Sequence, residues 1–299
     1  LGFFRIWSIP MDQVEGIMGR FVPAIPIAQQ ELDKKGISAD MDRYTKPFIN
    51  EAVLFTYFGY DNEYAKQHFV KSLQDGKYEL SPNFQTQRSV EAYFKILPND
   101  EWHLKMQQGL YNLISNVILF KGDEPKTYHF RFNMEGTLSF QNLDEKSKNA
   151  LRDLYVNYFF VRQDKAWEKE ALNKLPMLKK STNMLICGED LGLVPNCVPH
   201  VLRQLGMLSL EVQRMPKASN KTFFHPTDAP YLSVVTPSSH DTSTIRGWWE
   251  EDKNKTQQFF NHEIGQKGQA PEFCEPWINK AILSQHLYSP AMWAIFQLQ

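Results

Sequence analysis

Residues 184–192 read Met-Leu-Ile-Cys-Gly-Glu-Asp-Leu-Gly, a short apolar run that stops at two adjacent carboxylates. An apolar run of this length, bounded by turn-forming residues, is typical of a buried strand. In barrels and open α/β folds, the residues at the carboxyl ends of such strands face the substrate. We therefore expect a buried strand at residues 184–187, followed by two acids, Glu189 and Asp190, at a functional edge.

A helix is predicted directly after the acids. Asn196 is a plausible N-cap, Pro199 fits the first turn, and Gly206 is a typical stop. Apolar residues between these signals recur on one helical face, at Val198, Val201, Leu202 and Leu205. The strand, the acidic loop and the helix would together form one β/α unit.

Two further strands are predicted towards the carboxyl end. Residues 207–214 alternate between apolar and polar side chains, and residues 231–236 form an apolar run that enters Pro-Ser-Ser-His-Asp-Thr-Ser-Thr at 237–244. The second of these strands again ends near an acid, Asp241. Because the parallel strands of a barrel present their carboxyl ends at one face, we expect Glu189 and Asp241 to share a cleft. The predicted fold class is α/β, as part of a (β/α)8 barrel.

The middle of the chain predicts helices. Residues 110–118 and 151–159 carry apolar side chains at three-and-four spacing, and Asn50 is a possible N-cap for a helix over residues 51–57. The aromatic residues within 151–159 are either core packing or a platform on which sugars stack, and packing is the commoner use of such a stripe. Residues 175–178, which include a proline, are expected to lead into the strand at 184–187.

The composition describes a globular protein with a sizeable core. Its 299 residues are 42% hydrophobic and 13% aromatic, and the formal net charge is −1. The near-neutral charge argues against nucleic acid as a partner, and no apolar run approaches the roughly 20 residues of a membrane helix. The three cysteines, Cys187, Cys197 and Cys274, have neither metal-ligand spacing nor the even number of a disulfide scaffold. A reducing compartment, the cytosol, is therefore expected.

Glu189 is the first candidate for catalysis. Most of the 34 acidic residues must be solvated surface charges. An acid at the end of a buried strand is partly desolvated, however, which raises the pKa of its carboxyl group towards a value useful for proton donation. Asp241 could stabilise positive charge in the same cleft. His240 and Ser239 could bind sugar hydroxyls, or serve only as a structural and a turn-forming residue.

Several motifs resemble those of the 4-α-glucanotransferases of glycoside hydrolase family 77, the amylomaltases or disproportionating enzymes. They are Gly-Glu-Asp-Leu-Gly at 188–192, Ser-His-Asp-Thr-Ser-Thr at 239–244 and Gly-Phe-Phe-Arg-Ile-Trp-Ser-Ile-Pro at 2–10. Shorter similarities extend along the chain, at residues 131–133, 158–163, 213–216 and 289–296. The likeness is closest to the plant-type members, which pass glucosyl units from maltose to a soluble heteroglycan in the cytosol.

The resemblance implies a role for each matching residue. Glu189 matches the general acid/base of the family, and Asp241 matches the carboxylate that stabilises the transition state by binding sugar hydroxyls. His240 and Ser239 are expected to bind substrate beside Asp241. Asp190 is expected to bind substrate or to organise the loop that carries Glu189.

The nucleophilic aspartate of the family has no match in the chain. In the family it lies in an Arg-x-Asp-His stretch a few residues before the Gly-Phe that corresponds to Gly2-Phe3, and the chain starts at Leu1. We therefore expect a fragment that is inactive by itself. Compact bacterial members have a much shorter separation between nucleophile and acid/base. The resemblance thus implies a barrel segment at 1–30, a large, mainly helical insertion at 31–170 and the carboxyl-terminal part of the barrel at 171–299.

The implied mechanism is retaining and has two steps. Glu189 protonates the departing glycosidic oxygen while the aspartate attacks the anomeric carbon, and Glu189 then deprotonates the 4-hydroxyl of an acceptor glucan. Transfer exceeds hydrolysis only if sugar displaces water at the acceptor side. Trp7, Trp248 and Trp249 are candidates for that displacement, although core packing explains each of them equally well. No metal or organic cofactor is implied.

Two other functions fit the same residues. A retaining α-glucan hydrolase would use the same acids and differ in how well water is excluded from the acceptor side. In a non-catalytic glucan-binding protein, the lack of a nucleophile would be genuine. An in-frame Arg-x-Asp-His stretch in the upstream coding sequence would favour the enzyme. The expected partners are maltose and α-glucan or heteroglycan substrates, and no oligomeric state is predicted.

Overall fold

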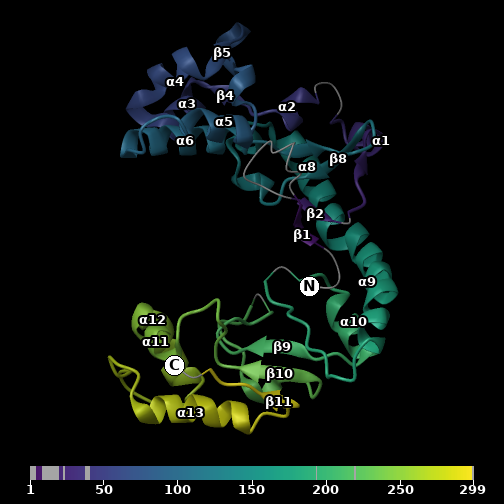
Figure 1. The fold of residues 1–299 in the computed structure, drawn as a ribbon, viewed down its shortest axis with the longest axis vertical. Coiled ribbons are helices and arrows are strands. Elements are labelled where there is room, and N and C mark those ends of the chain that lie inside the picture. Colours follow the sequence, from purple (N-terminus) through teal and green to yellow (C-terminus); the bar gives the residue numbers. More distant parts are fainter. Residues whose placement is uncertain are drawn as a thin grey trace. The chain divides into compact units, whose positions relative to one another are not determined.

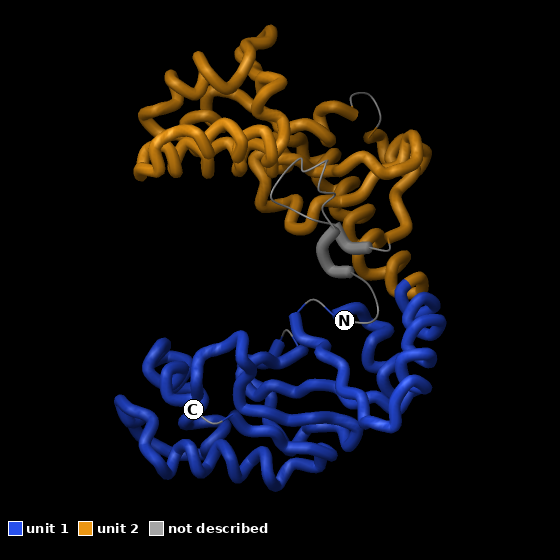
Figure 2. The backbone as a smooth tube through the Cα atoms, viewed as in Figure 1, with its two compact units in different colours: residues 1–3, 167–299 blue, residues 4–166 orange. Residues whose placement is uncertain are grey.

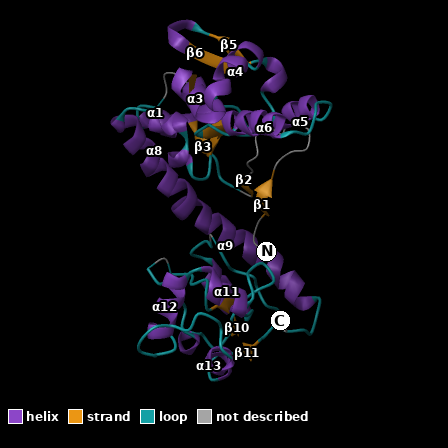
Figure 3. Ribbon diagram, turned by 90° about the vertical axis from the view of Figure 1, so that its left-hand side faces the viewer, coloured by secondary structure: helices purple, strands orange, loops and turns teal. Residues whose placement is uncertain are grey.

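The chain divides into two compact units in the computed structural model, which describes residues 5–8, 20–22, 24–37, 41–192, 194–218 and 220–297. Unit 1 consists of residues 1–3 and 167–299, and unit 2 consists of residues 4–166 (Figure 2). Helices and short strands occur in both units, so the chain has the mixed α/β composition that the sequence predicts (Figure 3). Within the described ranges, no helix is both long enough and apolar enough to cross a membrane.

Unit 1 contains a parallel sheet with the strand order β11-β10-β9 (Figure 1). The strands are β9 (Ser209–Val212), β10 (Ser233–Thr236) and β11 (Trp293–Ala294). In the register of this sheet, Val235 of β10 lies opposite Glu211 of β9 and Ala294 of β11. The strands predicted within 207–214 and 231–236 are therefore confirmed, each over four residues.

The prediction of a buried strand at residues 184–187 is wrong. Only Cys187 pairs with the sheet, through an isolated parallel bridge to Leu208. In this bridge the Leu208 N–H donates to the Ile186 carbonyl, and the Gly188 N–H donates to the Leu208 carbonyl. Met184 and Leu185 are 76% and 52% exposed instead of buried. The physical reason is that, among the described residues, no strand lies beyond this segment to complete a ladder and cover it.

The helix predicted after the acids is α10 (Val198–Leu205). Pro199 lies in its first turn, and Gly206 ends it in the left-handed conformation with φ of 60°, as expected from the sequence. The N-cap is Cys197, one residue after the predicted Asn196. The remaining helical segments of the carboxyl part are η6 (Pro226–Asp228), α11 (Ile245–Glu251), α12 (Lys253–His262) and α13 (Pro276–Leu287).

Residues 175–178 do not form a connector, because α9 (Gln163–Lys180) continues through them with Pro176 inside the helix. Trp167, Ala171 and Leu175 recur every four residues along α9 and are buried. This apolar face stabilises the helix across the proline, which removes one backbone hydrogen bond and crowds the carbonyl of the preceding turn. The local proline signal is therefore outweighed by packing.

Unit 2 is built around two antiparallel three-stranded sheets and several helices. One sheet has the order β3-β8-β7, and the other has the order β4-β6-β5. The strands are β1 (Arg5–Ser8), β2 (Arg20–Val22), β3 (Ile27–Ala28), β4 (Ile49–Asn50), β5 (Val70–Ser72), β6 (Lys77–Leu80), β7 (Leu119–Lys121) and β8 (Thr127–Phe130). Strands β1 and β2 pair with each other as a separate ribbon.

The helices of unit 2 cover these sheets and form its main core. They are α1 (Gln29–Lys34), α2 (Asp42–Thr45), α3 (Glu51–Phe58), α4 (Asn62–His68), α5 (Gln87–Phe94), α6 (Glu101–Ile114), α7 (Leu138–Gln141) and α8 (Glu145–Asn157). The predicted cap of α3 is confirmed, since the side chain of Asn50 accepts a hydrogen bond of 2.9 Å from the Val53 N–H. Phe58 of α3 and Leu110 of α6 are fully buried in this core.

Helix α6 ends earlier than the periodicity predicts. Val117 and Ile118 are buried as expected, but they follow the helix end at Ile114 and lead into β7. The Ile118 N–H donates to the Tyr44 carbonyl, a partner far away in the sequence. Apolar periodicity alone cannot distinguish a last helical turn from a buried connector of this kind.

The aromatic stripe within 151–159 is core packing. Helix α8 continues after Asn157 into a wider π-helical turn, η5 (Tyr158–Arg162). Tyr158 and Phe159 are 1% and 5% exposed, and the Tyr158 hydroxyl lies 2.7 Å from Nδ1 of the buried His129. Side chains buried in this way are not available as a platform for sugars.

Candidate active site

The two acid-bearing loops leave the same edge of the unit 1 sheet. Glu189 follows the bridge at Cys187, and residues 237–241 follow β10. Val212, the last residue of β9, lies opposite Thr236, the last residue of β10. Because all these pairings are parallel, the segments that follow them emerge at one edge. Strand direction therefore gathers the Glu189 loop and the Asp241 loop on the carboxyl side of the sheet.

Glu189 itself is exposed, so the desolvation expected from a buried strand end is not observed. Its carboxylate accepts a 2.9 Å hydrogen bond from the Leu191 N–H, which holds the side chain against its own loop. The expectation fails for the same reason as the predicted strand at 184–187, since no described segment covers this flank of the sheet. A carboxylate in this position can exchange protons with molecules that reach the carboxyl edge.

Asp190 points inward and anchors the loop. It is 5% exposed, and Oδ1 accepts a 2.9 Å hydrogen bond from the Leu210 N–H of β9. Oδ2 lies 2.7 Å from Nζ of Lys217, which also contacts the buried Glu211 at 2.8 Å. The lysine attracts both buried carboxylates, and its single positive charge offsets one of their two negative charges. The contacts of Asp190 are therefore those of a residue that fixes Glu189 relative to β9.

His240 and Asp241 are presented to solvent. Their side chains are 92% and 80% exposed, and Nε2 of His240 lies 3.3 Å from Oδ2 of Asp241. Ser239 supports their turn, because its Oγ accepts from the Asp241 N–H at 3.3 Å and its own N–H donates to Oγ1 of Thr242 at 3.0 Å. The pair can therefore donate and accept hydrogen bonds outward, as recognition of sugar hydroxyls requires.

Arg214 holds this turn, and the sequence did not single it out. Its guanidinium donates to the Pro237 carbonyl at 3.1 Å and to the Ser243 carbonyl at 2.6 Å, and it also reaches Oγ1 of Thr242 at 3.2 Å. Burial lowers the pKa of Arg214 from its ordinary value, but a guanidinium remains charged in proteins. Its available signals were its position at the end of the predicted strand 207–214 and within the family-like stretch 213–216. Arg214 connects the end of β9 to both sides of the His240–Asp241 turn.

Three tryptophans were predicted as candidates for the acceptor side. Trp249 is fully buried, and its Nε1 donates to the Pro271 carbonyl at 2.9 Å, so it belongs to the core. Trp248 is 9% exposed and packs edge-on against Phe223 and Phe259, with ring centroids 6.0 and 5.1 Å apart. The guanidinium of Arg214 lies 5.3 Å from the Trp248 ring centroid. Packing therefore accounts for Trp248, and its ring is not offered to a sugar. Trp7 belongs to β1, and its side chain lies outside the described residues.

Within the described part of the chain, no group of three or more His, Cys, Asp or Glu side chains is arranged to hold a metal ion. The carboxyl edge itself offers two acids, a histidine and hydroxyl groups. Glu189 and Asp241 follow parallel segments on either side of β9, and each loop is held by a charged side chain that follows β9, Lys217 or Arg214. This arrangement suits proton transfer combined with binding of hydroxyl groups.

Comparison with known proteins gives the family. The model of the 4-alpha-glucanotransferases, glycoside hydrolase family 77, matches residues 1–299. The chain belongs to this family. It is 40% identical over 313 aligned residues to 4-alpha-glucanotransferase DPE2 of Oryza sativa subsp. japonica, and this match covers 100% of the chain and 32% of the rice protein.

Bacterial relatives match less of the chain. A 4-alpha-glucanotransferase of Chlamydia pneumoniae is 31% identical over 242 residues, which cover 72% of the chain and 44% of that protein. A 4-alpha-glucanotransferase of Chlamydia trachomatis is 31% identical over 87 residues, or 28% of the chain. The chain thus spans about a third of the rice relative and less than half of the Chlamydia pneumoniae relative.

Proposed function

We propose that the polypeptide to which these 299 residues belong is a 4-α-glucanotransferase of the cytosol that acts in starch and maltose metabolism. It transfers glucosyl units from maltose or malto-oligosaccharides to an α-glucan or heteroglycan acceptor. Support comes from the family match over residues 1–299 and from the names of the relatives. The activity belongs to a longer polypeptide in this proposal, because the chain spans only 32% of the rice relative.

We further propose that unit 1 is the carboxyl-terminal part of a (β/α)8 barrel. Its strands pair in parallel in the order of the sequence, which is the order of barrel strands. Both flanks of the sheet expose apolar side chains, Met184 and Leu185 on one side and Trp293 and Ile295 on the other, all more than half exposed. Exposed apolar flanks are what further barrel strands would cover.

The domain limits belong to the same proposal. The change of unit between Ala166 and Trp167 supports a barrel part that begins near residue 171. Residues 31–170 are then the insertion, which contains the β4-β6-β5 sheet, the strands β7 and β8 of the other antiparallel sheet, and helices. That residues 1–30 are a barrel segment stays a prediction.

The observation that carries the proposed mechanism is the shared carboxyl edge of Glu189 and Asp241. In a retaining double displacement, Glu189 first donates a proton to the glycosidic oxygen and then removes one from the acceptor 4-hydroxyl. Asp241 and His240 bind the hydroxyls of the reacting sugar, and Ser239 either joins them or only shapes their turn. Asp190 positions the Glu189 loop through Lys217 and Leu210.

The nucleophile of this mechanism is an aspartate in an Arg-x-Asp-His stretch, and no such stretch occurs in the printed sequence. We therefore expect the 299 residues alone to be inactive. The test compares two polypeptides incubated with maltose and glycogen, one of 299 residues and one in which an Arg-x-Asp-His stretch precedes Leu1. Glucosyl transfer is expected only in the longer polypeptide. Clear turnover by the 299 residues would contradict the assignment of the covalent mechanism.

The same assay separates the two alternative functions. An α-glucan hydrolase would release glucose from maltose without lengthening glycogen chains, because water and not sugar accepts the glucosyl unit. A glucan-binding protein would bind glycogen and release no glucose, both as the polypeptide of 299 residues and as the longer polypeptide. Analysis of both the free glucose and the glycogen chain lengths therefore distinguishes transfer, hydrolysis and binding.

A further inference from the structure

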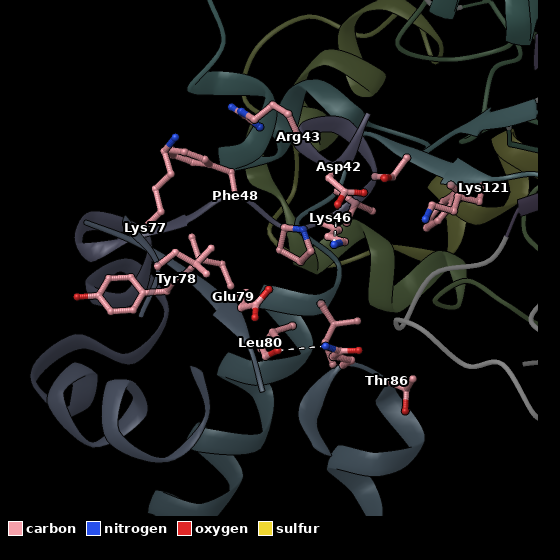
Figure 4. A pocket seen from close by; sticks show the side chains of 18 residues that line it. Asp42, Arg43, Lys46, Phe48, Lys77, Tyr78, Glu79, Leu80, Thr86 and Lys121 are labelled. Carbon is pink, nitrogen blue, oxygen red and sulfur yellow. Dashed lines mark hydrogen bonds and ion pairs between the residues drawn. The ribbon is translucent and has the colours of Figure 1, made fainter. Parts of the chain in front are cut away.

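A cavity of about 570 Å³ lies within unit 2, outside the edge that carries Glu189 (Figure 4). It lies where the two antiparallel sheets of this unit come together, because residues of β6 and of β7 both line it. Residues 42–49 and the segment around Gln85 close the remaining sides. Its volume is within the range of about 300–1,000 Å³ that small-molecule sites occupy.

One wall of the cavity is fixed by buried polar groups. The Phe48 N–H donates to Oγ of Ser139 at 2.9 Å, and the Phe48 carbonyl accepts from Nδ2 of Asn116 at 3.2 Å. Asn116 and Ser139 are 1% and 0% exposed. Arg43 donates to the Ser139 carbonyl at 2.9 Å, and its guanidinium lies 4.4 Å from the Phe48 ring centroid. The ring and the guanidinium are therefore held in place before any ligand arrives.

The lining carries an excess of positive charge. Four cations and two acids line the cavity, namely Arg43, Lys46, Lys77, Lys121, Asp42 and Glu79. Asp42 is engaged by Lys46, with Oδ2 and Nζ 2.7 Å apart. Lys77 and Lys121 are exposed, and neither forms an ion pair with any residue that the structure describes. Four cations against two acids leave the lining with a net positive charge, which attracts an anion, and phosphate is a common partner of lysine.

The rest of the lining suits the apolar face of a sugar. Ile49, Leu80 and Ile114 are buried and form an apolar floor. The rings of Phe48 and Tyr78 are partly buried beside it, and Figure 4 shows Thr86 at the rim. Flat rings together with hydroxyl and amide groups are the usual surroundings of a bound pyranose, which has both an apolar face and a ring of hydroxyls.

We propose that this cavity binds a sugar that carries a phosphate group. The positive charge of Lys77 and Lys121 attracts the phosphate, and the rings of Phe48 and Tyr78 receive the apolar face of the sugar. The inference that the ligand carries a phosphate group rests only on the charges that line the cavity. The choice of a glucose-type sugar rests on the proposed function. The ligand is either a free sugar phosphate or a phosphorylated residue of a glucan chain, since both present the same chemistry.

The test is isothermal titration calorimetry on the 299-residue chain. The probes are glucose 6-phosphate, glucose, inorganic phosphate, and a phosphorylated dextrin before and after treatment with a phosphatase. Glucose 6-phosphate should bind more tightly than either glucose or phosphate, and phosphatase treatment should weaken dextrin binding. Tighter binding of glucose 6-phosphate than of the phosphorylated dextrin indicates a free sugar phosphate as the ligand. The opposite order indicates a phosphorylated residue of a glucan chain. Binding of glucose as tight as that of glucose 6-phosphate, or no binding by any probe, would overturn the proposal.

Charge variants place the ligand in the cavity. Lys77→Gln and Lys121→Gln should each weaken glucose 6-phosphate binding about three- to tenfold, as expected for loss of an exposed charge interaction. Lys71→Gln is the matched control, since Lys71 lies on the neighbouring strand β5 and does not line the cavity. Equal affinities for all three variants would remove the cavity as the binding site. Circular dichroism confirms that the exposed substitutions leave the fold intact.

Failure of this proposal is distinguishable from failure of the proposed function. Lys77 and Lys121 lie in unit 2, whereas Glu189 and Asp241 lie in unit 1. The lysine variants in the longer polypeptide should therefore retain maltose transfer while they lose affinity for the phosphorylated sugar. Loss of transfer in these variants would contradict the separation of the two sites. Absence of transfer in the unmodified longer polypeptide would count against the proposed function alone.

Discussion

The two units of the chain differ in the direction of their strands. Unit 1 repeats parallel pairings in sequence order, whereas both sheets of unit 2 are antiparallel. Parallel strands need connections that return to the same end, so every loop after a strand emerges at one edge. In an antiparallel sheet, successive hairpin loops alternate between the two ends of the sheet, so the side chains that they carry are not brought together. The acids of unit 1 gather for this reason, whereas unit 2 forms a cavity between its sheets.

The two units also differ in how completely they bury their apolar residues. Unit 2 has a core of α3, α6 and the β4-β6-β5 sheet, in which Phe58 and Leu110 are fully buried. The sheet of unit 1 leaves apolar side chains exposed on both flanks, Met184 and Trp293 among them. Substitutions at its carboxyl edge should therefore change catalysis more than stability, and substitutions in the unit 2 core should do the opposite.

The largest effect is expected from Glu189→Gln in the longer polypeptide. Glutamine has nearly the same shape but cannot exchange a proton, so maltose transfer should fall by about 10²–10⁴-fold. Initial rates with maltose and glycogen measure the change. Glu124→Gln, an exposed substitution in unit 2, is the matched control and should leave the rate unchanged. Asp190→Asn should cost less than Glu189→Gln, because Asp190 anchors the loop without carrying the transferred proton.

The second prediction concerns Arg214→Met, which removes the contacts between β9 and the His240–Asp241 turn. We expect kcat to fall by about 10–100-fold, since hydrogen bonds to a charged group contribute about 1.5–3 kcal/mol each. The pH at which kcat is half-maximal should not move, because Arg214 exchanges no proton. Arg214→Lys should recover part of the loss, as one of the two carbonyls stays within reach. An unchanged kcat in Arg214→Met would show that the turn is held without it.

The third prediction tests the core of unit 2 through Gly109 of α6. A Cβ atom at this position would overlap the Phe58 ring, which is fully buried. Gly109→Ala should therefore lower the free energy of unfolding by about 1–3 kcal/mol, despite the better helix propensity of alanine. Urea unfolding monitored at unit 2 measures the loss. Adding Phe58→Leu makes room, so the double variant should be destabilised by less than the sum of the single variants.

The smallest effect is the pH dependence contributed by His286 in unit 1. Burial lowers the pKa of His286 below its ordinary value of 6.5, and the hydrogen bond of Nδ1 to the Ile282 carbonyl only partly opposes this. Below pH 6.5 the unfolded chain therefore binds a proton that the folded chain does not, so the stability of unit 1 should fall as the pH is lowered.

The comparison of His286→Phe with the original chain isolates this dependence. Urea unfolding between about pH 5.5 and 7.5 can be followed by tryptophan fluorescence. The tryptophans of unit 1 are Trp167, Trp248, Trp249, Trp277 and Trp293. The slope of stability against pH should become smaller in the variant. An identical slope in both proteins would show that His286 takes up its proton equally in the folded and unfolded chains.

Local signals predicted much of the secondary structure. The cap at Asn50, the stop at Gly206 and the strands β9 and β10 depend on residues that are adjacent in sequence, and the structure contains all of them. Burial of the aromatic residues after Leu151 was predicted from helical spacing and is also observed. Capping, turn and periodicity rules suffice where the stabilising contacts are local.

The features that were missed depend on contacts between distant residues. Lys217 meets Asp190 across 27 positions, and Arg214 meets Ser243 across 29. Glu189 is exposed because no described strand lies beyond the segment that carries it. Helix α9 continues through Pro176 because its apolar face is packed and buried. A single sequence gives no measure of which distant side chains meet, and for that reason the acids could be predicted but not the residues that hold their loops.

The most direct test of the account is to trap the covalent intermediate in the Glu189→Gln variant of the longer polypeptide. An activated donor such as α-glucosyl fluoride needs little protonation of its leaving group, so the first step should still proceed. Deprotonation of the acceptor is then slow, and mass spectrometry should show the protein with one glucosyl unit attached. Loss of transfer without this adduct, or maltose transfer at a near-normal rate, would contradict the assignment of Glu189 as the general acid/base.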